Sequence, residues 1–245
     1  MPAFAPFGSI SDHTWDVLSS GSEGTIAHRG KLDLVTPTGT RNLLSGKADV
    51  FLVRPSKAKP GTLLVAQGRD VLRVDPKSGA HETVAEQLPD SASTLVDEPS
   101  GRIWAGTGTK GLFVIEPGIG KSAAEPVGSR FGLAAGDGAT FVGLMRDTVV
   151  AFDPAGAHWL DPGTDLFRGI PGFPQGDVEA VSNCDDQGNL WVALEGEHPG
   201  MPPRVGELSF VGDGVVWSPK SIEGLETVGS LHMLRIEPSS EGNVL

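Results

Sequence analysis

Short apolar runs alternate with glycine- and proline-containing turns along most of the chain. The runs follow the two-residue alternation of β-strands and lack the 3.6-residue spacing of helices. One unit recurs about every 40 to 50 residues: a glycine after a polar turn, with an apolar run directly behind it. Its glycines are Gly24, Gly61, Gly101, Gly138, Gly188 and Gly242. A strand-built repeat of this length indicates the four-stranded blades of a β-propeller.

A further strand and a further turn follow each of the first four glycines. The strands cover residues 31–35, 71–74, 112–115 and 149–152, and each runs into a turn containing proline. Proline fixes φ for such a turn and has no amide hydrogen to donate to a sheet. The innermost strand of each blade is expected just before its glycine, as at residues 50–53 and 178–181.

We therefore predict an all-β fold, a single β-propeller over residues 1–245 with about five blades and a partial sixth. The expected blades span roughly 12–46, 47–90, 91–128, 129–174 and 175–229, with the partial blade at 230–245. A β-sandwich is the alternative, but it gives no reason for one motif to recur. The apolar residues three positions after each glycine, including Trp104 and Trp191, are expected to pack between blades.

The last residue, Leu245, falls inside the second strand of the expected sixth blade. Two interpretations remain open. In one, which we favour, the chain is a fragment of a longer protein. In the other, residues 3–10 supply the missing strands and close a six-bladed ring, because a propeller left open would expose an edge strand.

Two of the expected blades carry a more specific pattern. One reads Gly-Ile-Pro at 169–171, Asp-Val-Glu-Ala-Val at 177–181 and Asp-Asp-Gln-Gly-Asn-Leu-Trp-Val at 185–192; the other reads Gly-Arg-Ile-Trp-Ala-Gly-Thr at 101–107, then Gly-Leu at 111–112. This pattern resembles the blade consensus of the two-component regulator propeller family. The resemblance implies a periplasmic or extracellular sensor domain of a bacterial signal-transduction protein, whose partners are downstream signalling domains of the same protein.

Composition narrows the classes of partner. The chain has 31 acidic against 19 basic residues, a net charge of -12, and no basic run, which argues against nucleic acid as a partner. No stretch approaches the roughly 20 apolar residues of a membrane helix, so direct membrane insertion is not expected. The N-terminal residues lack the features of a signal peptide. Cys184 is the only cysteine, so no internal disulfide is expected.

Four of the expected turns between second and third strands carry a basic residue: Arg29, Arg69, Lys110 and Arg146. Four cations at equivalent positions in an acidic protein predict a ring that binds a small anionic ligand, such as an acidic sugar or oligosaccharide. The simpler interpretation is that charged residues are common on exposed hairpin tips.

The fifth such turn, at residues 195–204, is expanded. Long loops in an otherwise economical repeat often carry function. Glu195, Glu197 and His198 are therefore candidate ligand-binding residues, able in principle to supply acid–base groups. Their spacing matches no recognised metal motif, so neither a metal nor a cofactor is expected. A solvated loop is the alternative.

No nucleophile elbow, phosphate loop or other catalytic motif is found in the sequence. The leading hypothesis is a non-catalytic, ligand-sensing propeller that binds a small molecule or an oligosaccharide. One alternative is a carbohydrate-active or lactone-cleaving propeller enzyme with Glu195, Glu197 and His198 near the chemistry. The other is a protein-interaction scaffold, which predicts a broad exposed apolar patch.

Overall fold

The computed structural model describes residues 14–20, 23–28, 30–118, 122–133, 138, 140–185, 187–198 and 201–222. Within these residues the chain is all-β, apart from one short 3-10 turn, η1 (Ser129–Phe131). The predicted all-β class is therefore confirmed. The expected partial blade at 230–245 and the N-terminal residues 3–10 lie outside the described residues, so blade number and ring closure stay predictions. No helix long and apolar enough to cross a membrane is found in the described part of the chain.

The described strands form five four-stranded antiparallel sheets. In chain order the sheets consist of β1 (Thr14–Ser20), β2 (Glu23–His28), β3 (Lys31–Thr36) and β4 (Gly39–Ser45); β5 (Val50–Pro55), β6 (Leu63–Gln67), β7 (Asp70–Val74) and β8 (His81–Ala85); β9 (Ala92–Asp97), β10 (Ile103–Thr107), β11 (Leu112–Ile115) and β12 (Ala124–Pro126); β13 (Phe141–Met145), β14 (Thr148–Asp153), β15 (Gly156–Asp161) and β16 (Leu166–Gly169); β17 (Val178–Cys184), β18 (Leu190–Leu194), β19 (Arg204–Val211) and β20 (Gly214–Lys220).

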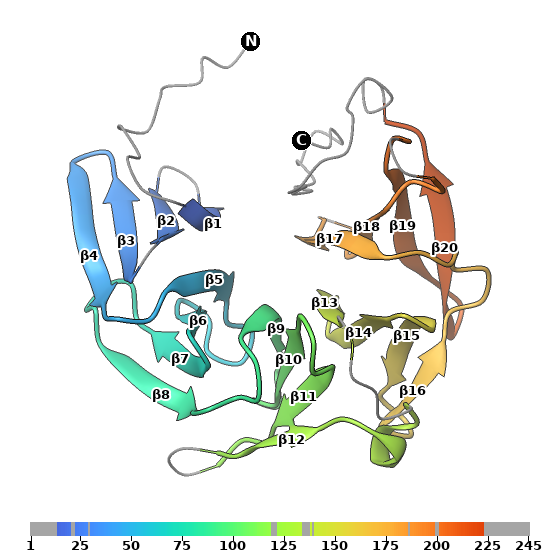
Figure 1. The fold of residues 1–245 in the computed structure, drawn as a ribbon, viewed down its shortest axis with the longest axis horizontal. Coiled ribbons are helices and arrows are strands. Elements are labelled where there is room, and N and C mark those ends of the chain that lie inside the picture. Colours follow the sequence, from blue (N-terminus) through green and yellow to red (C-terminus); the bar gives the residue numbers. More distant parts are fainter. Residues whose placement is uncertain are drawn as a thin grey trace.

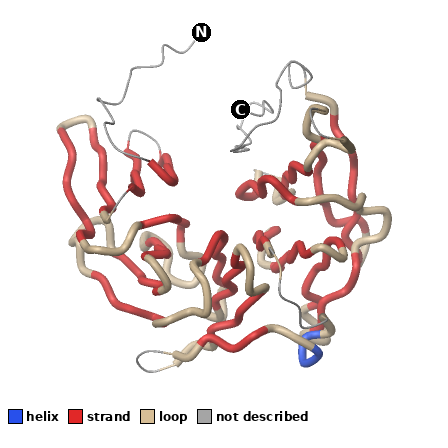
Figure 2. Tube along the Cα trace, in the orientation of Figure 1, coloured by secondary structure: helices blue, strands red, loops and turns tan. Residues whose placement is uncertain are grey.

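Each sheet is a simple meander whose first strand is innermost (Figure 1). The first strands of successive sheets contact one another: β1 with β5, β5 with β9, β9 with β13 and β13 with β17. The outer strands lie farther from this centre, and the five sheets lie side by side around it (Figure 2). The arrangement is propeller-like.

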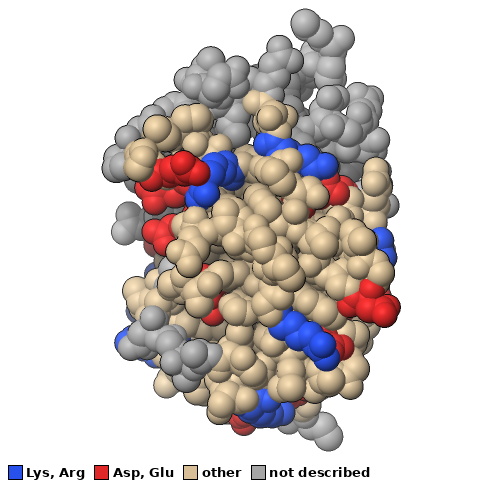
Figure 3. Space-filling model, turned by 90° about the vertical axis from the view of Figure 1, so that its right-hand side faces the viewer, with Lys and Arg blue, Asp and Glu red and all other residues tan. Residues whose placement is uncertain are grey.

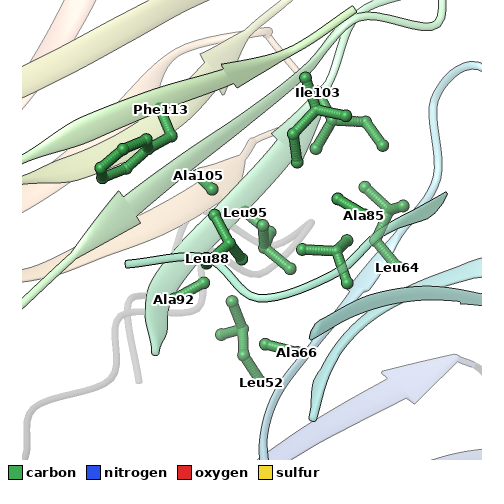
Figure 4. Packing of buried hydrophobic residues seen from close by; sticks show 12 residues of the cluster. Leu52, Leu64, Ala66, Ala85, Leu88, Ala92, Leu95, Ile103, Ala105 and Phe113 are labelled. Atoms are coloured by element: carbon green, nitrogen blue, oxygen red, sulfur yellow. The ribbon is translucent and has the colours of Figure 1, made fainter. Parts of the chain in front are cut away.

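The two-residue alternation of the strands explains how neighbouring sheets pack. In β10, Ile103 and Ala105 point toward the second sheet, where they meet Leu64 in one buried cluster (Figure 4). Trp104, between them in sequence, points toward the fourth sheet and belongs to another buried cluster. Successive residues of a strand face opposite sides of the sheet, so the consecutive apolar residues at 103–105 serve two cores.

A repeated turn precedes the two tryptophans of the motif. Glu98 accepts a hydrogen bond from the Trp104 indole nitrogen at 2.6 Å, and Asp185 accepts one from the Trp191 indole nitrogen at 3.2 Å. In both turns the glycine amide bonds back to the backbone carbonyl of the acidic residue. The glycines have φ near +94° and +79°, a conformation that favours glycine. The sequence pattern acid-x-x-Gly-x-x-Trp thus specifies one closed turn.

The two tryptophans differ in burial. Trp104 is fully buried, with Phe131 and Phe167 edge-on to its ring at centroid distances of 5.2 and 5.4 Å. Trp191 is only half-buried, on the face of the fifth sheet that points away from the fourth. Packing between sheets is therefore observed for Trp104, whereas no described sheet covers Trp191.

The fourth sheet departs from the expected register. Gly138 was expected in the turn after an innermost strand, but it lies before β13, which is itself innermost. Its carbonyl accepts a hydrogen bond from the Gly111 amide at 3.0 Å, at the β10–β11 turn. Residues 141–145, expected to form a second strand, therefore form a first strand. The sheet is completed by the unforeseen strand β16.

Replacing Trp104 by alanine should lower the free energy of unfolding by about 3–5 kcal/mol, because a fully buried aromatic side chain leaves a cavity between two sheets. The matched change Trp191→Ala should cost at most about half as much, since that side chain is half-buried already. Urea unfolding followed by circular dichroism measures both. Equal losses would show that the burial difference between the two positions is wrong.

Candidate ligand-binding cavity

The structure separates the predicted site residues between two ends of the molecule. The turns after second strands lie beside the starts of the innermost strands: Gly68 donates to the Asp49 carbonyl, and Glu195 donates to the Asp177 carbonyl, each at 2.8 Å. We call this the entry end. The opposite, exit end carries the turns after first strands, such as Glu98–Gly101. Arg69, Lys110 and Glu195 lie at the entry end.

Arg146 lies at the exit end, in the β13–β14 turn, because of the changed register of the fourth sheet. Its expected place in a turn between second and third strands is therefore wrong. Arg29 lies outside the described residues. The proposed ring of four equivalent cations is thus represented at the entry end by Arg69 and Lys110 alone among the described residues.

At the entry end, the predicted residues make mainly local contacts. The Arg69 guanidinium donates to the Leu88 carbonyl, and the Leu88 amide donates back to the Arg69 carbonyl at 2.8 Å, which ties the turn to the chain leaving the second sheet. Lys110 is exposed in the β10–β11 turn, where its amide donates to the Thr107 hydroxyl at 3.0 Å.

The expanded loop of the fifth sheet is held by an arginine whose role was not anticipated. Arg204 donates to the Gln175 carbonyl at 2.7 Å and the Glu195 carbonyl at 3.3 Å, and lies 3.8 Å from the Glu197 carboxylate. Glu195, Glu197 and His198 are exposed. Among the described residues no group of three or more acidic, histidine or cysteine side chains is placed to hold a metal ion.

A cavity of about 1200 Å³ opens at the exit end, where residues of all five innermost strands meet. One lining residue from each strand is Leu18, Arg54, Asp97, Leu144 and Cys184. Small-molecule sites commonly enclose about 300–1000 Å³, so this space can hold a sizeable ligand. We call it the central cavity.

The charged lining of the central cavity is predominantly basic. The described lining includes five cationic residues: Arg41, Arg54, Lys57, Lys77 and Arg146. Asp97 is the only acidic residue among the described residues that line the cavity. Arg146, which the sequence predicts as a ligand-binding residue in a turn between second and third strands, lines this cavity from the β13–β14 turn. None of the other four lies in a turn between second and third strands, the positions at which the sequence predicts the cationic ring.

Asp97 is committed to internal contacts. Its carboxylate is fully buried and accepts hydrogen bonds from the Ser56 hydroxyl at 2.5 Å and the Lys57 amide at 2.6 Å. Arg73 lies 3.7 Å away. Asp97 thereby links the end of β9 to the β5–β6 turn and fixes the backbone of Lys57. The Lys57 ammonium itself is half-exposed, 3.2 Å from the more exposed Asp147.

Arg54 and Arg146 are held differently. Arg54 contacts Asp16 at 2.6 Å, so its charge is largely balanced within the protein. The Arg146 guanidinium lies 5.3 Å from the centre of the Phe210 ring, with no carboxylate paired to it among the described residues. The Arg146 amide approaches the Cys184 sulfur at 3.2 Å. Arg146, and Lys57, whose pair with Asp147 is exposed and therefore weak, are accordingly cations able to meet an anion from solution.

Cys184 provides a natural reporter on the wall of the central cavity. Its thiol donates to the Leu144 carbonyl at 2.7 Å. Burial raises the pKa of the thiol above its ordinary value, because the thiolate would lose contact with water.

Comparisons with known proteins identify the fold but no family. No protein-family model matches the chain, and no curated protein matches it. The chain superposes on the extracellular domain of BT4673 from B. thetaiotaomicron, a proposed one-component system, with a TM-score of 0.60 and 15% identity over 98% of this chain and 32% of that chain. A second structure of the BT4673 extracellular domain, described as a proposed hybrid two-component system, gives a TM-score of 0.60 and 12% identity over 97% and 37%.

The computationally designed protein Ika8 also superposes, with a TM-score of 0.59 and 10% identity over 94% of this chain and 67% of that chain. At such identities the similarity shows a shared fold. The chain spans about a third of the two extracellular domains, at 32% and 37% of their lengths. Both are described as extracellular domains of a one- or two-component system, which agrees with the two-component regulator propeller family that the blade motifs resemble.

Asp97→Asn should lower the free energy of unfolding by about 2–4 kcal/mol, because a buried amide group replaces an oxygen that several donors share. Asp147→Asn, at a side chain that is 63% exposed, should change it by no more than about 0.5 kcal/mol. Urea titration of both variants measures the difference. A loss at Asp97 as small as that at Asp147 would contradict the linking role.

Alkylation of Cys184 by iodoacetamide should require a higher pH in the folded protein than in urea, since the thiolate is the reactive form and burial raises the thiol pKa. The chain has one cysteine, so mass spectrometry of the whole protein reports this site alone. The same pH dependence for folded and unfolded protein would refute the assigned environment.

Proposed function

We propose that this chain is part of a non-catalytic, ligand-sensing β-propeller that belongs to a bacterial signal-transduction protein. Its ligand is a small anionic molecule, such as an acidic saccharide, bound in the central cavity. The observation that carries the proposal is the charge of that cavity. Five basic residues line it, and the one described carboxylate among them is occupied by internal hydrogen bonds.

Electrostatics favour this site over the rest of the surface. The protein carries a net charge of -12, so an anion is repelled by most of the molecule. At physiological salt such interactions fade over about 8 Å, and the local cations then dominate. A concave site, partly shielded from solvent, strengthens their attraction further.

The fold supports a sensory role. The two extracellular domains to which the chain is similar come from a protein described as a proposed signalling system, and the sequence resembles the blades of the two-component regulator propeller family. We therefore place the domain outside the cytoplasm and assign the output to signalling domains elsewhere in the same protein.

The surface favours this reading over a protein-interaction scaffold. A scaffold predicts a broad exposed apolar patch. The exposed large hydrophobic residues among those described are Leu166, Met201 and Val211, from three different segments. On the side of the molecule seen in Figure 3, acidic and basic side chains are scattered and do not gather in one region.

Isothermal titration with galacturonic acid and with the neutral sugar galactose tests the proposal. Galacturonic acid should bind, galactose should not, and binding should weaken as salt is added. Lys57→Met and Arg146→Met should each weaken binding about tenfold or more, because each removes a charge-assisted hydrogen bond.

Lys110→Met is the matched control, since it removes a lysine at the entry end. It should leave the affinity unchanged. Equal losses in all three variants, or binding of galactose as tight as that of galacturonic acid, would sink the assignment of an anion to the central cavity.

A further inference from the structure

The central cavity continues outward between the first and second sheets, which lie side by side (Figure 1). Its walls there are formed by the β3–β4 turn on one side and by the β5–β6 and β7–β8 turns on the other. Four threonines line this extension: Thr36, Thr38, Thr40 and Thr62. We call it the threonine groove.

The backbone in the groove is uncovered. A methyl group built on Gly39 or Gly61 would meet no atom within 4 Å, so there is open space above both residues. Farther out, Arg41 donates to the Pro76 carbonyl and, at 2.9 Å, to the Lys77 carbonyl. These bonds link the first sheet to the second and hold the two walls in register.

Hydrogen-bond accounting shows what kind of group the groove can accept. The Thr62 hydroxyl donates its hydrogen to the Lys59 carbonyl at 2.7 Å. The Thr36 hydroxyl donates to the Gly39 carbonyl at 3.1 Å and accepts from the Thr38 amide at 3.3 Å, so the Thr38 hydroxyl, 3.0 Å away, donates its own hydrogen to Thr36. A hydroxyl has one hydrogen and two lone pairs. Thr36 is therefore saturated, whereas the Thr38 and Thr62 oxygens act as acceptors toward a ligand and require donor groups.

A fifth hydroxyl in the lining lacks a partner. Thr25 is 5% exposed, and its hydroxyl oxygen is buried with no hydrogen bond to any described atom. Buried polar groups nearly always have a partner, and this hydroxyl is available to a polar group that enters the cavity. The groove thus offers acceptors, while Lys57 and Arg146 at the centre offer charged donors.

We infer that the site has two parts with opposite demands, and that its ligand is a polyhydroxylated acid longer than one sugar unit. The acid group binds the cations at the centre, and the hydroxyl groups of a neutral unit donate to the threonine groove. This inference rests on the proposed function and adds the second part. The cavity volume of about 1200 Å³, above the usual range for one small molecule, fits such a ligand.

The test compares galacturonic acid with galacturonic acid linked to one neutral hexose, by isothermal titration. The disaccharide should bind at least about tenfold more tightly, since several neutral hydrogen bonds are added. Thr38→Val should reduce that gain about fivefold and leave the affinity for galacturonic acid itself unchanged. Thr83→Val, a matched change on β8 away from the cavity lining, should have no effect.

Urea unfolding shows first that each variant is folded, and Thr62→Val replaces Thr38→Val if that variant is not. A parallel arm with galactose 6-sulfate and galactose 6-phosphate identifies which acid group the centre accepts. If the single sugar and the disaccharide bind with equal affinity and Lys57→Met weakens both, the role of the threonine groove is contradicted and the central anion site is not. If the disaccharide binds more tightly than the single sugar but Lys57→Met weakens the binding of neither, the central anion site is contradicted instead. Absence of binding by every compound overturns both.

Discussion

The burial of both faces of each sheet between its neighbours is the constraint on which the described structure depends. Strands such as β10 are buried at every position, and alternate apolar side chains enter two separate cores. The hydrophobic effect therefore fixes how neighbouring sheets stack as well as the strands within each sheet. Because the innermost strands are held next to one another in this way, their ends converge, and all five contribute to the lining of the central cavity.

Polar residues complete the site where the apolar packing ends. Asp97 is buried at the end of β9, yet its contacts lie in the second sheet, at Ser56 and Lys57. A buried carboxylate is costly unless it is hydrogen-bonded, so the turn that carries Lys57 is held in place by that requirement. The cationic surface of the cavity is thus a consequence of how neighbouring sheets are joined.

Much of the fold could be predicted from the sequence because its signals are local. Strand alternation and the glycine turns at Gly101 and Gly188 specify hairpins within a few residues. The register of the fourth sheet could not be predicted from the sequence. Gly138 precedes an apolar strand just as Gly101 and Gly188 do, but it lies at the entry end of its sheet, whereas they lie at the exit end. A hairpin pattern does not state which strand is innermost. The turn at Pro162 and Gly163, between Gly138 and Gly188, indicates the extra strand β16 and with it the changed register. The central cavity was missed because its residues meet only through long-range packing.

The central claim is that an anion binds at the exit end. Methyl-resolved NMR spectra recorded during a titration with galacturonic acid test it most directly, since Val142, Leu144 and Val181 line the central cavity, whereas Leu194 lies at the entry end beside the expanded loop. The account predicts that the methyl signals of the first three residues shift and that those of Leu194 do not. Shifts confined to Leu194 and its neighbours, or no shifts at all, would contradict it.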